Sequence, residues 1–159
     1  MTPAPTQAYL DTLLLYYEEE IEGEAFFNGL AEVSAHPSQQ DKLRLMAAVE
    51  NHAAKVTLPL IRKHGLTPRR NADLCRSGRE MAQKAAKPWG DLLAEFARDF
   101  PGYIEDFQRL EAMAPPEDRP RLNLLTEHEV AAVAFLDLEI SGDPNSVDPM
   151  QAYLRMDIE

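Results

Sequence analysis

Apolar residues recur at spacings of three and four residues along four long stretches of the chain, and this pattern limits the fold more than any other feature. The stretches are residues 6–35, 39–64, 89–113 and 118–141. They are far longer than ordinary β-strands, and the sequence has neither an alternating strand pattern nor an Asn-Gly or Asp-Gly hairpin turn. The sequence therefore predicts an all-α protein built around four long helices.

The connections between these helices predict their arrangement. Residues 36–38 and 114–117 are short breaks, and short loops make the flanking helices antiparallel neighbours. Residues 65–88 form a long connection, and an extended chain covers up to about 3.3–3.6 Å per residue, so this segment can travel the length of a bundle. We therefore expect a four-helix bundle with one long central crossover. The alternative is an up-down-up-down bundle with an oversized surface loop.

Glycine, proline and polar residues mark the expected helix ends and bends. Gly65 and Gly142 follow the second and fourth helices, as is typical of helix C-termini. Ser38 is placed to cap the start of the second helix. Pro59 and Pro101 lie inside the second and third helices, so we expect a bend at the former and a kink or break at the latter.

Shorter elements complete the expected architecture. Within the crossover, Asn71 could cap a short helix over residues 72–86, and a last short helix is expected around residues 146–156. Residues 1–5, with two prolines, look like a loose tail. A chain of this length is typical of one domain, so residues 1–159 are expected to form a single helical domain.

The net charge of −11 hides a strong asymmetry along the chain. Residues 62–87 carry a net charge of +6, whereas residues 6–35 contain seven acidic residues and no Lys or Arg. One interpretation is that the basic crossover covers the acidic first helix. The other is that it docks an anionic small molecule or an acidic partner. The acidic balance argues against nucleic acid as a partner, because that binding depends on Lys and Arg neutralising phosphates.

Composition excludes several other classes of protein. A single cysteine, Cys75, rules out an intrachain disulfide and any multi-cysteine metal site. The sequence has no apolar run near 18 residues and no charged-then-apolar leader, so we expect a cytoplasmic protein without a membrane-spanning segment.

Several ionisable residues fall on the apolar lines of these helices. A carboxylate on a core-facing line is costly unless it is paired, protonated or bound to a metal. The candidates for such a metal site are Glu20, Glu24, Glu50, His128 and Glu139.

Counting along the helices places some of these candidates at one height. Glu24, Glu50 and His128 each lie about 11–14 residues from the nearest short loop. At about 1.5 Å per residue they fall within roughly 3 Å of one level, and Tyr103 of the third helix lies at that level too. Two carboxylates and an imidazole are a sensible ligand set for iron or manganese.

These residues give the chain a resemblance to the ferritin-like superfamily, over residues 6–141. The stretches that carry it are Glu20-Ile21-Glu22-Gly23-Glu24-Ala25-Phe26-Phe27, Val49-Glu50-Asn51-His52, and His128-Glu129 with Phe135 and Glu139. The resemblance implies a ferritin-like four-helix bundle and a non-haem iron or manganese oxidoreductase.

The sequence also departs from the di-iron members of that superfamily, which carry Glu-x-x-His on two helices and a lone Glu on the other two. Glu50 and His52 are only two residues apart, and Leu125 stands three residues before His128. Phe100 lies on the third helix where a ligand would be expected. Three interpretations stay open: a complete di-iron site, a single-metal or altered site, and a metal-free hydrogen-bonded cluster that fixes the helix register.

Three functional hypotheses follow. In the first, iron or manganese held by Glu24, Glu50 and His128 acts on oxygen or peroxide, with Tyr103 as a catalytic hydrogen-bond or radical partner. In the second, the protein is a non-catalytic bundle that binds a partner or forms a homodimer. In the third, kinks at the internal prolines open an apolar-ligand pocket between the helices.

Overall fold

The computed structural model describes residues 3–157, and this part of the chain is helical and contains no strand. The elements are α1 (Gln7–Val33), α2 (Pro37–Lys63), α3 (Asn71–Ala85), α4 (Trp89–Met113), the 3-10 turn η1 (Pro116–Asp118), α5 (Arg119–Ile140) and α6 (Asp148–Leu154). The all-α prediction is confirmed. Residues 3–5 precede α1 without helical structure, and the first two residues of the expected tail lie outside the described range. Among the described helices, none is both long and apolar enough to cross a membrane.

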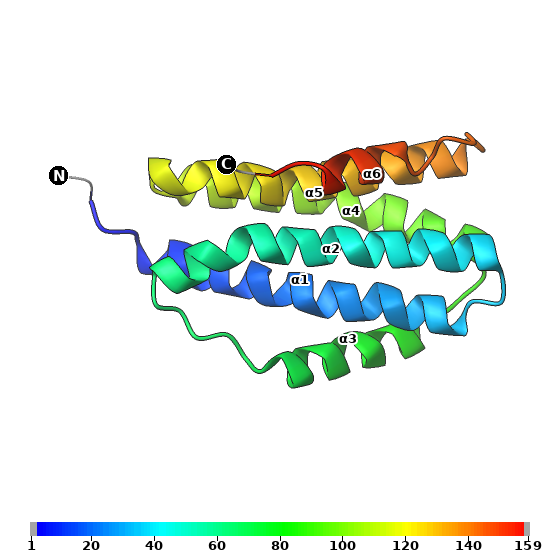
Figure 1. The fold of residues 1–159 in the computed structure, drawn as a ribbon, viewed down its shortest axis with the longest axis horizontal. Coiled ribbons are helices and arrows are strands. Elements are labelled where there is room, and N and C mark those ends of the chain that lie inside the picture. Colours follow the sequence, from blue (N-terminus) through cyan, green and yellow to red (C-terminus); the bar gives the residue numbers. More distant parts are fainter. Residues whose placement is uncertain (1–2, 158–159) are drawn as a thin grey trace.

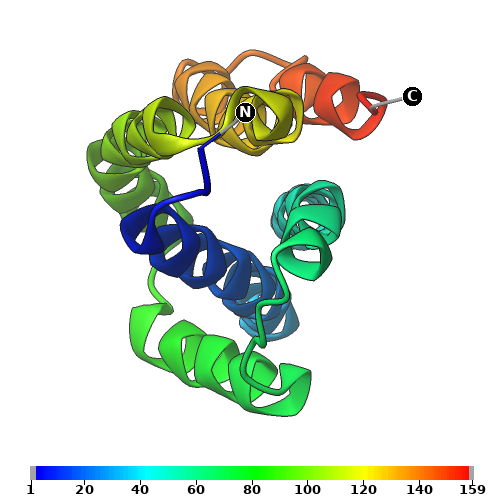
Figure 2. The ribbon, with the colours of Figure 1, turned by 90° about the vertical axis from the view of Figure 1, so that its left-hand side faces the viewer.

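The long helices pack as two antiparallel pairs (Figure 1). One pair is α1 with α2 and the other is α4 with α5, and the pairs meet mainly where α2 contacts α5. The connection from α2 to α4 contains α3, which packs on α1 on the side away from α4, α5 and α6 (Figure 2). The short α6 packs against both α5 and α2. Helix α1 therefore lies between α3 and the second pair.

The glycine signals for helix ends are confirmed. Gly65 and Gly142 have φ values of 63° and 78°, a region that is strained for residues with a Cβ, and each follows the end of a long helix. The expected N-caps are displaced by one or two residues. Helix α2 begins at Pro37 rather than after Ser38, because proline's fixed φ suits the first turn, and Asn71 is the first residue of α3.

Neither internal proline ends its helix. Helix α2 continues past Pro59, and α4 continues past Pro101, so the break allowed at that position does not occur. The buried face of α4 runs through the proline from Phe100 to Phe107, and this packing offsets the lost backbone hydrogen bond.

The apolar core is divided into two clusters, one at each end of the long helices. The change from one cluster to the other falls at residues 49–53 of α2, 100–107 of α4 and 125–131 of α5. Apolar packing is therefore interrupted at one level, halfway along the pairs, and this is the level at which the sequence placed its candidate site.

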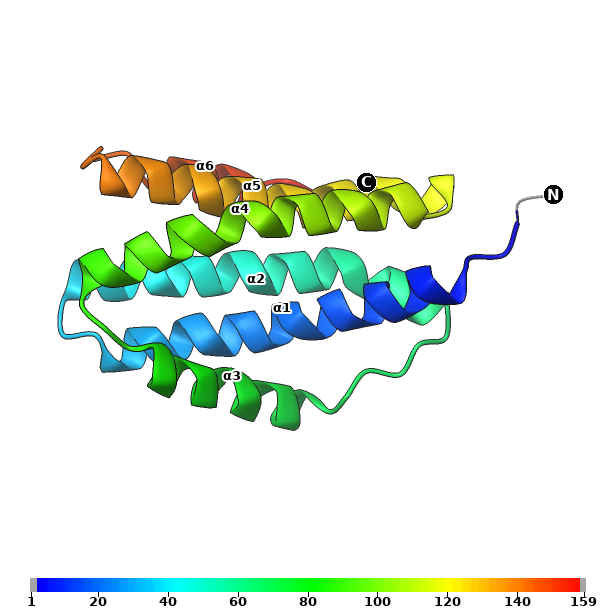
Figure 3. The ribbon, with the colours of Figure 1, turned by 180° about the vertical axis from the view of Figure 1, so that it is seen from behind.

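The basic connection lies against the acidic helix α1, as the first interpretation of the charge asymmetry expects (Figure 3). Arg69 contacts Glu18 at 3.4 Å and Glu22 at 3.1 Å. Arg79 pairs with Glu32 at 2.9 Å. All three contacts involve half-exposed arginines, so each contributes at most about 1 kcal/mol.

The packing of α3 on α1 depends on a close backbone approach at Gly78. A Cβ built there would lie 2.2 Å from the backbone oxygen of Glu22 and 2.9 Å from the Cβ of Ala25. Because no side chain fits in that space, α3 can sit this close to α1 only with glycine at this position.

Candidate metal centre

Three ionisable side chains from three helices meet in the gap between the two apolar clusters. They are Glu20 of α1, Glu50 of α2 and His128 of α5, and each offers a ligand atom within 4.8 Å of the others. Glu20 and His128 are buried, and the side chain of Glu50 is 14 % exposed. Of the five residues predicted as metal ligands, these three are brought together.

One nitrogen of His128 faces all the carboxylates of the group. Its Nε2 lies 2.9 Å from Oε2 of Glu20 and 3.4 Å from Oε2 of Glu50. A further carboxylate belongs to the adjacent residue Glu129, whose Oε2 is 3.5 Å from the same nitrogen. Three carboxylates therefore share a single imidazole. Glu20, Glu50, Glu129 and His128 are called the Glu–His group below.

The other nitrogen of His128 is fixed by the backbone. Its Nδ1 contacts the carbonyl oxygen of Leu125, and a carbonyl only accepts, so Nδ1 carries the proton and donates it. The edge-on contact with Phe107, at 5.2 Å between ring centroids, holds the ring in place. Metal-binding histidines usually have this arrangement, because a hydrogen bond on one nitrogen orients the lone pair of the other.

Crowding of the carboxylates changes their protonation. Burial, and then the neighbouring Glu20, raise the pKa of Glu50 well above its usual range, against the opposing effect of His128. Burial also raises the pKa of Glu129 to about 8. Burial lowers the pKa of His128, but Glu20 and Glu50 raise it by more, so it lies well above its usual value. Without a bound cation, the group therefore holds protons that exposed carboxylates would have lost at pH 7.

Unsatisfied buried atoms test whether a cation fits this group. Oε2 of Glu20 and Oε1 of Glu129 are buried and have no hydrogen-bond partner among the described residues. Oε2 of Glu20 is close to the imidazole of His128, yet the contact lacks hydrogen-bond geometry. A buried carboxylate oxygen without a hydrogen bond is costly in a folded core, and a divalent cation held by Glu20, Glu50 and His128 would satisfy Oε2 of Glu20. A set of carboxylate oxygens and one imidazole nitrogen suits iron or manganese.

Helix α4 sends no ligand into the group, and a cavity of about 550 Å³ lies at this level instead. Glu20, Glu50 and Glu129 line its inner part. Tyr103, predicted as a catalytic partner, also lines the cavity, but its side chain is 45 % exposed and its ring contact is with Phe100. Within the group, only Glu129 affects the pKa of its hydroxyl, which it raises after burial and Asp99. The cavity gives a small molecule a route from outside to the group.

Glu24 lies outside the group. It is one helical turn beyond Glu20, is only partly buried, and accepts a hydrogen bond of 3.0 Å from Nδ2 of Asn51. Four residues on an α-helix turn through about 400°, so the two side chains point about 40° apart. That difference is enough to turn Glu24 toward the seam between α1 and α2 and to leave Glu20 facing His128.

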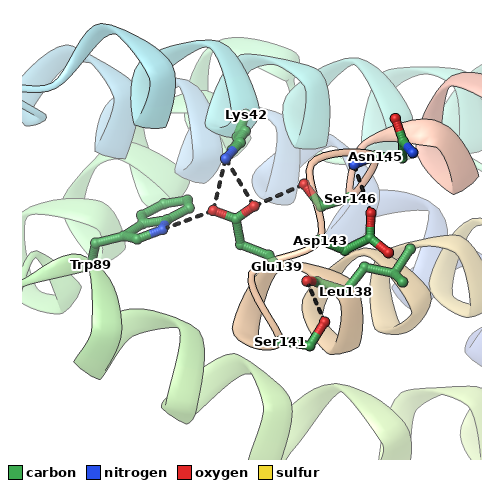
Figure 4. Close-up of polar contacts among 8 residues, drawn as sticks. All are labelled: Lys42, Trp89, Leu138, Glu139, Ser141, Asp143, Asn145 and Ser146. Atoms are coloured by element: carbon green, nitrogen blue, oxygen red, sulfur yellow. Dashed lines mark hydrogen bonds and ion pairs between the residues drawn. The ribbon is translucent and has the colours of Figure 1, made fainter.

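Glu139 also lies outside the group, next to the last residue of α5, and Figure 4 shows its polar contacts. Lys42 donates to both of its carboxylate oxygens at 2.8 Å, Ser146 donates at 2.8 Å, and Trp89 donates through Nε1 at 3.2 Å. Burial opposes ionisation here, but these donors outweigh it and lower the pKa of Glu139. The carboxylate is fully occupied by the protein, so its role as a metal ligand is corrected to that of a helix-joining contact.

A similar contact at the opposite end of the pairs escaped the sequence interpretation. Asp118 of η1 is fully buried and accepts hydrogen bonds from Tyr9 at 2.7 Å and from Lys63 at 2.5 Å. Nε2 of His64 lies 2.7 Å from the same carboxylate. Burial raises the pKa of Asp118, but the three partners lower it by more. This acid joins the start of α1, the end of α2 and the start of α5.

Two residues at the group were missed from the sequence. Glu129 follows His128 directly, and adjacency to a candidate ligand was the available signal, but neighbours on a helix point about 100° apart. Tyr153 of α6 is fully buried, its hydroxyl has no hydrogen-bond partner among the described residues, and its ring lies 6.3 Å from that of His128. No sequence signal placed this short helix beside the group.

No family model matches the chain, and neither the curated proteins nor the solved structures give a match.

Proposed function

We propose that this chain is a metal-binding protein of ferritin-like fold that holds one iron or manganese ion with Glu20, Glu50 and His128 and acts as an oxidoreductase. The observation that carries the proposal is the convergence of three ligand atoms within 4.8 Å, from three helices, in the gap between two apolar clusters. The buried Oε2 atom of Glu20, which makes no hydrogen bond among the described residues, supports it.

The helix arrangement supports the fold part of the proposal. Two antiparallel pairs with a long connection between them, which contains a helix of its own, are what a ferritin-like bundle with a central crossover requires. Ligands projecting inward from facing helices are also typical of that class.

The donor set favours one ion over two. A di-iron site needs a carboxylate from each of the four helices and two histidines, whereas α4 contributes no ligand and only His128 enters the group. A bound iron or manganese ion would supply one-electron redox chemistry at the inner part of the cavity. The chain itself orients the imidazole through the Leu125 carbonyl, gathers the carboxylates and keeps the group largely out of solvent.

Metal loading tests the proposal directly. Chelator-treated protein is loaded anaerobically with Fe(II) or Mn(II), desalted and measured for metal content and, with manganese, for its electron paramagnetic resonance spectrum. We expect about one retained ion per chain. Glu50→Gln should lose it, and the iron-loaded wild type should consume oxygen or peroxide faster than free iron.

Glu139→Gln is the matched control, because it removes a partly buried acid that lies outside the group. It should retain the ion. Absence of retained metal in the wild type, or equal retention by Glu50→Gln, would overturn the proposal and leave the group as a metal-free polar cluster.

A further inference from the structure

The cavity beside the Glu–His group has a lining of unusual composition. At about 550 Å³ it is large enough for a drug-sized ligand, and its walls come mainly from α1 and α4. Its described lining residues include eight carboxylates and seven aromatic side chains, but no Lys, Arg or His. A lining of this kind repels anions, and it offers two different attractions to a cation.

The aromatic wall is preformed. Phe96 and Phe100 stack with centroids 4.8 Å apart, and Phe27 meets Phe96 edge-on at 5.7 Å. Tyr16 meets Phe107 edge-on at 5.2 Å. Packed rings present apolar surface to a ligand body, and their faces attract an ammonium group.

Six of the eight carboxylates form an inner and an outer set, and the other two, Glu22 and Glu95, pair with Arg69 and Lys87. The inner set is Glu20, Glu50 and Glu129. The outer set consists of Glu19 on α1 with Asp99 and Asp106 on α4, and all three line the cavity. Burial, and then these three acids together with Glu129 of the inner set, raise the pKa of the Tyr103 hydroxyl. Asp99 and Asp106 pair with Arg98 and Arg109, whose side chains are 70 % and 68 % exposed, and such exposed pairs neutralise a carboxylate only weakly.

A buried atom also points to a ligand in this space. Glu129 lines the cavity, is only 4 % exposed, and its Oε1 has no hydrogen-bond partner in the described chain. The acidic lining therefore differs from a solvated surface, because the Oε1 atom of Glu129 is removed from water without gaining a hydrogen bond.

We propose that this cavity binds a small organic cation, an amine with an apolar body, as the substrate class of the metal site. The ammonium group lies among Glu19, Asp99 and Asp106, and the apolar body lies against the Phe96–Phe100 stack. The amine's role as a substrate rests on the proposed function, whereas its binding does not require a metal.

Three probes of one shape test the inference: 3-phenylpropylamine, the neutral 3-phenylpropanol and the anionic 3-phenylpropanoate. Each is titrated calorimetrically into metal-free and into Mn(II)-loaded wild-type protein at about 0.15 M salt, where long-range charge effects are screened beyond about 8 Å. We expect the amine to bind at least about tenfold more tightly than the alcohol, and the anion to show no measurable binding. Equal binding of amine and alcohol would overturn the inference.

Variants locate the binding. The double variant Glu19→Gln, Asp99→Asn should bring the affinity for the amine down to that for the alcohol, and Phe100→Leu should weaken both. Glu105→Gln is the matched control, because Glu105 is an exposed acid of α4 that does not line the cavity. An equal loss in the control would mean nonspecific attraction and would overturn the inference.

The two proposals fail separately. Amine selectivity in a protein that retains no metal would overturn the proposed function and support the binding site. Retained metal without amine selectivity would overturn the inference and support the proposed function.

Discussion

Acids in the middle of the long helices and acids at their ends have opposite surroundings and opposite pKa shifts. At the ends, Asp118 and Glu139 each collect three donors, one of them a lysine, and the pKa of each is lowered. In the middle, three carboxylates share the one imidazole of His128, and the pKa values of Glu50 and Glu129 are raised. The end acids are satisfied by the protein alone, whereas the middle acids are satisfied only in part.

This difference separates acids that hold the fold together from acids that are available to a ligand. Removing an end acid should cost stability and leave metal binding intact. Removing a middle acid should cost metal binding and leave stability intact. The predictions below test each half of that statement.

The largest effect is expected for Asp118→Asn in metal-free protein. The change leaves Lys63 and His64 facing a neutral amide. Breaking a buried charge pair costs about 3–5 kcal/mol, and we expect the lower value because the Lys63 side chain is half-exposed. Urea denaturation measures the loss. The exposed neighbour Glu117 is the control, since Glu117→Gln should change stability by less than about 0.5 kcal/mol. A loss below about 1 kcal/mol for Asp118→Asn would contradict the comparison.

Glu50→Gln should lower Mn(II) affinity about 100-fold, which corresponds to about 2.7 kcal/mol. In metal-free protein the same change should leave stability unchanged, because the raised pKa of Glu50 already favours its neutral form and the neutral amide has nearly the same shape. Titration followed by electron paramagnetic resonance measures the affinity, and urea denaturation measures the stability. A loss of more than about 2 kcal/mol in metal-free stability would place this residue with the end acids.

Low pH should remove the stability that the charged Asp118 carboxylate contributes. Because the folded-state pKa of Asp118 is lowered, its contribution is complete above the unfolded-state pKa near about 3.9 and is lost as pH falls through the folded-state value. The stability difference between wild type and Asp118→Asn should therefore shrink below about pH 4. Denaturation curves between neutral pH and about pH 2.5 give that difference, and a constant gap across the range would argue against a charged Asp118.

The smallest effect is expected for Gly23→Ala. A Cβ there would lie 3.1 Å from Cδ and 3.2 Å from Oε2 of Glu50, so the carboxylate must shift by a few tenths of an ångström. We expect about a tenfold loss of metal affinity, while the better helix propensity of alanine adds up to about 1 kcal/mol of stability. Gly102→Ala is the control, because a Cβ at Gly102 meets nothing within 4 Å. Unchanged metal affinity in Gly23→Ala would show that the position of Glu50 is not critical.

The helices were predictable because periodicity and end signals act locally. Every long helix starts and ends within about two residues of its expected bounds, and the glycine stops at Gly65 and Gly142 are in place. The level of the candidate site was predictable too, because the rise per residue is fixed and the loops are short. Glu50 and His128 were found by that count.

The residue that α1 contributes to the Glu–His group was not predictable in the same way. Glu20 and Glu24 share one apolar line, and the choice between them depends on the rotation of α1, which is set by packing against α3 and α2. Glu139 lay on a core-facing line as expected, but its partners Lys42 and Trp89 come from distant parts of the chain. A sequence shows where a buried acid lies on its helix, but not which donors reach it.

The division of the Glu–His group between the two helix pairs has a consequence for the growing chain on the ribosome. Glu20 and Glu50 belong to the first pair, which can pack with α3 as soon as residue 85 has emerged. His128 arrives only with α5, so until then the two acids face each other without an imidazole between them. The last long helix therefore completes the second helix pair and the Glu–His group in one event, and a chain stalled before α5 has neither.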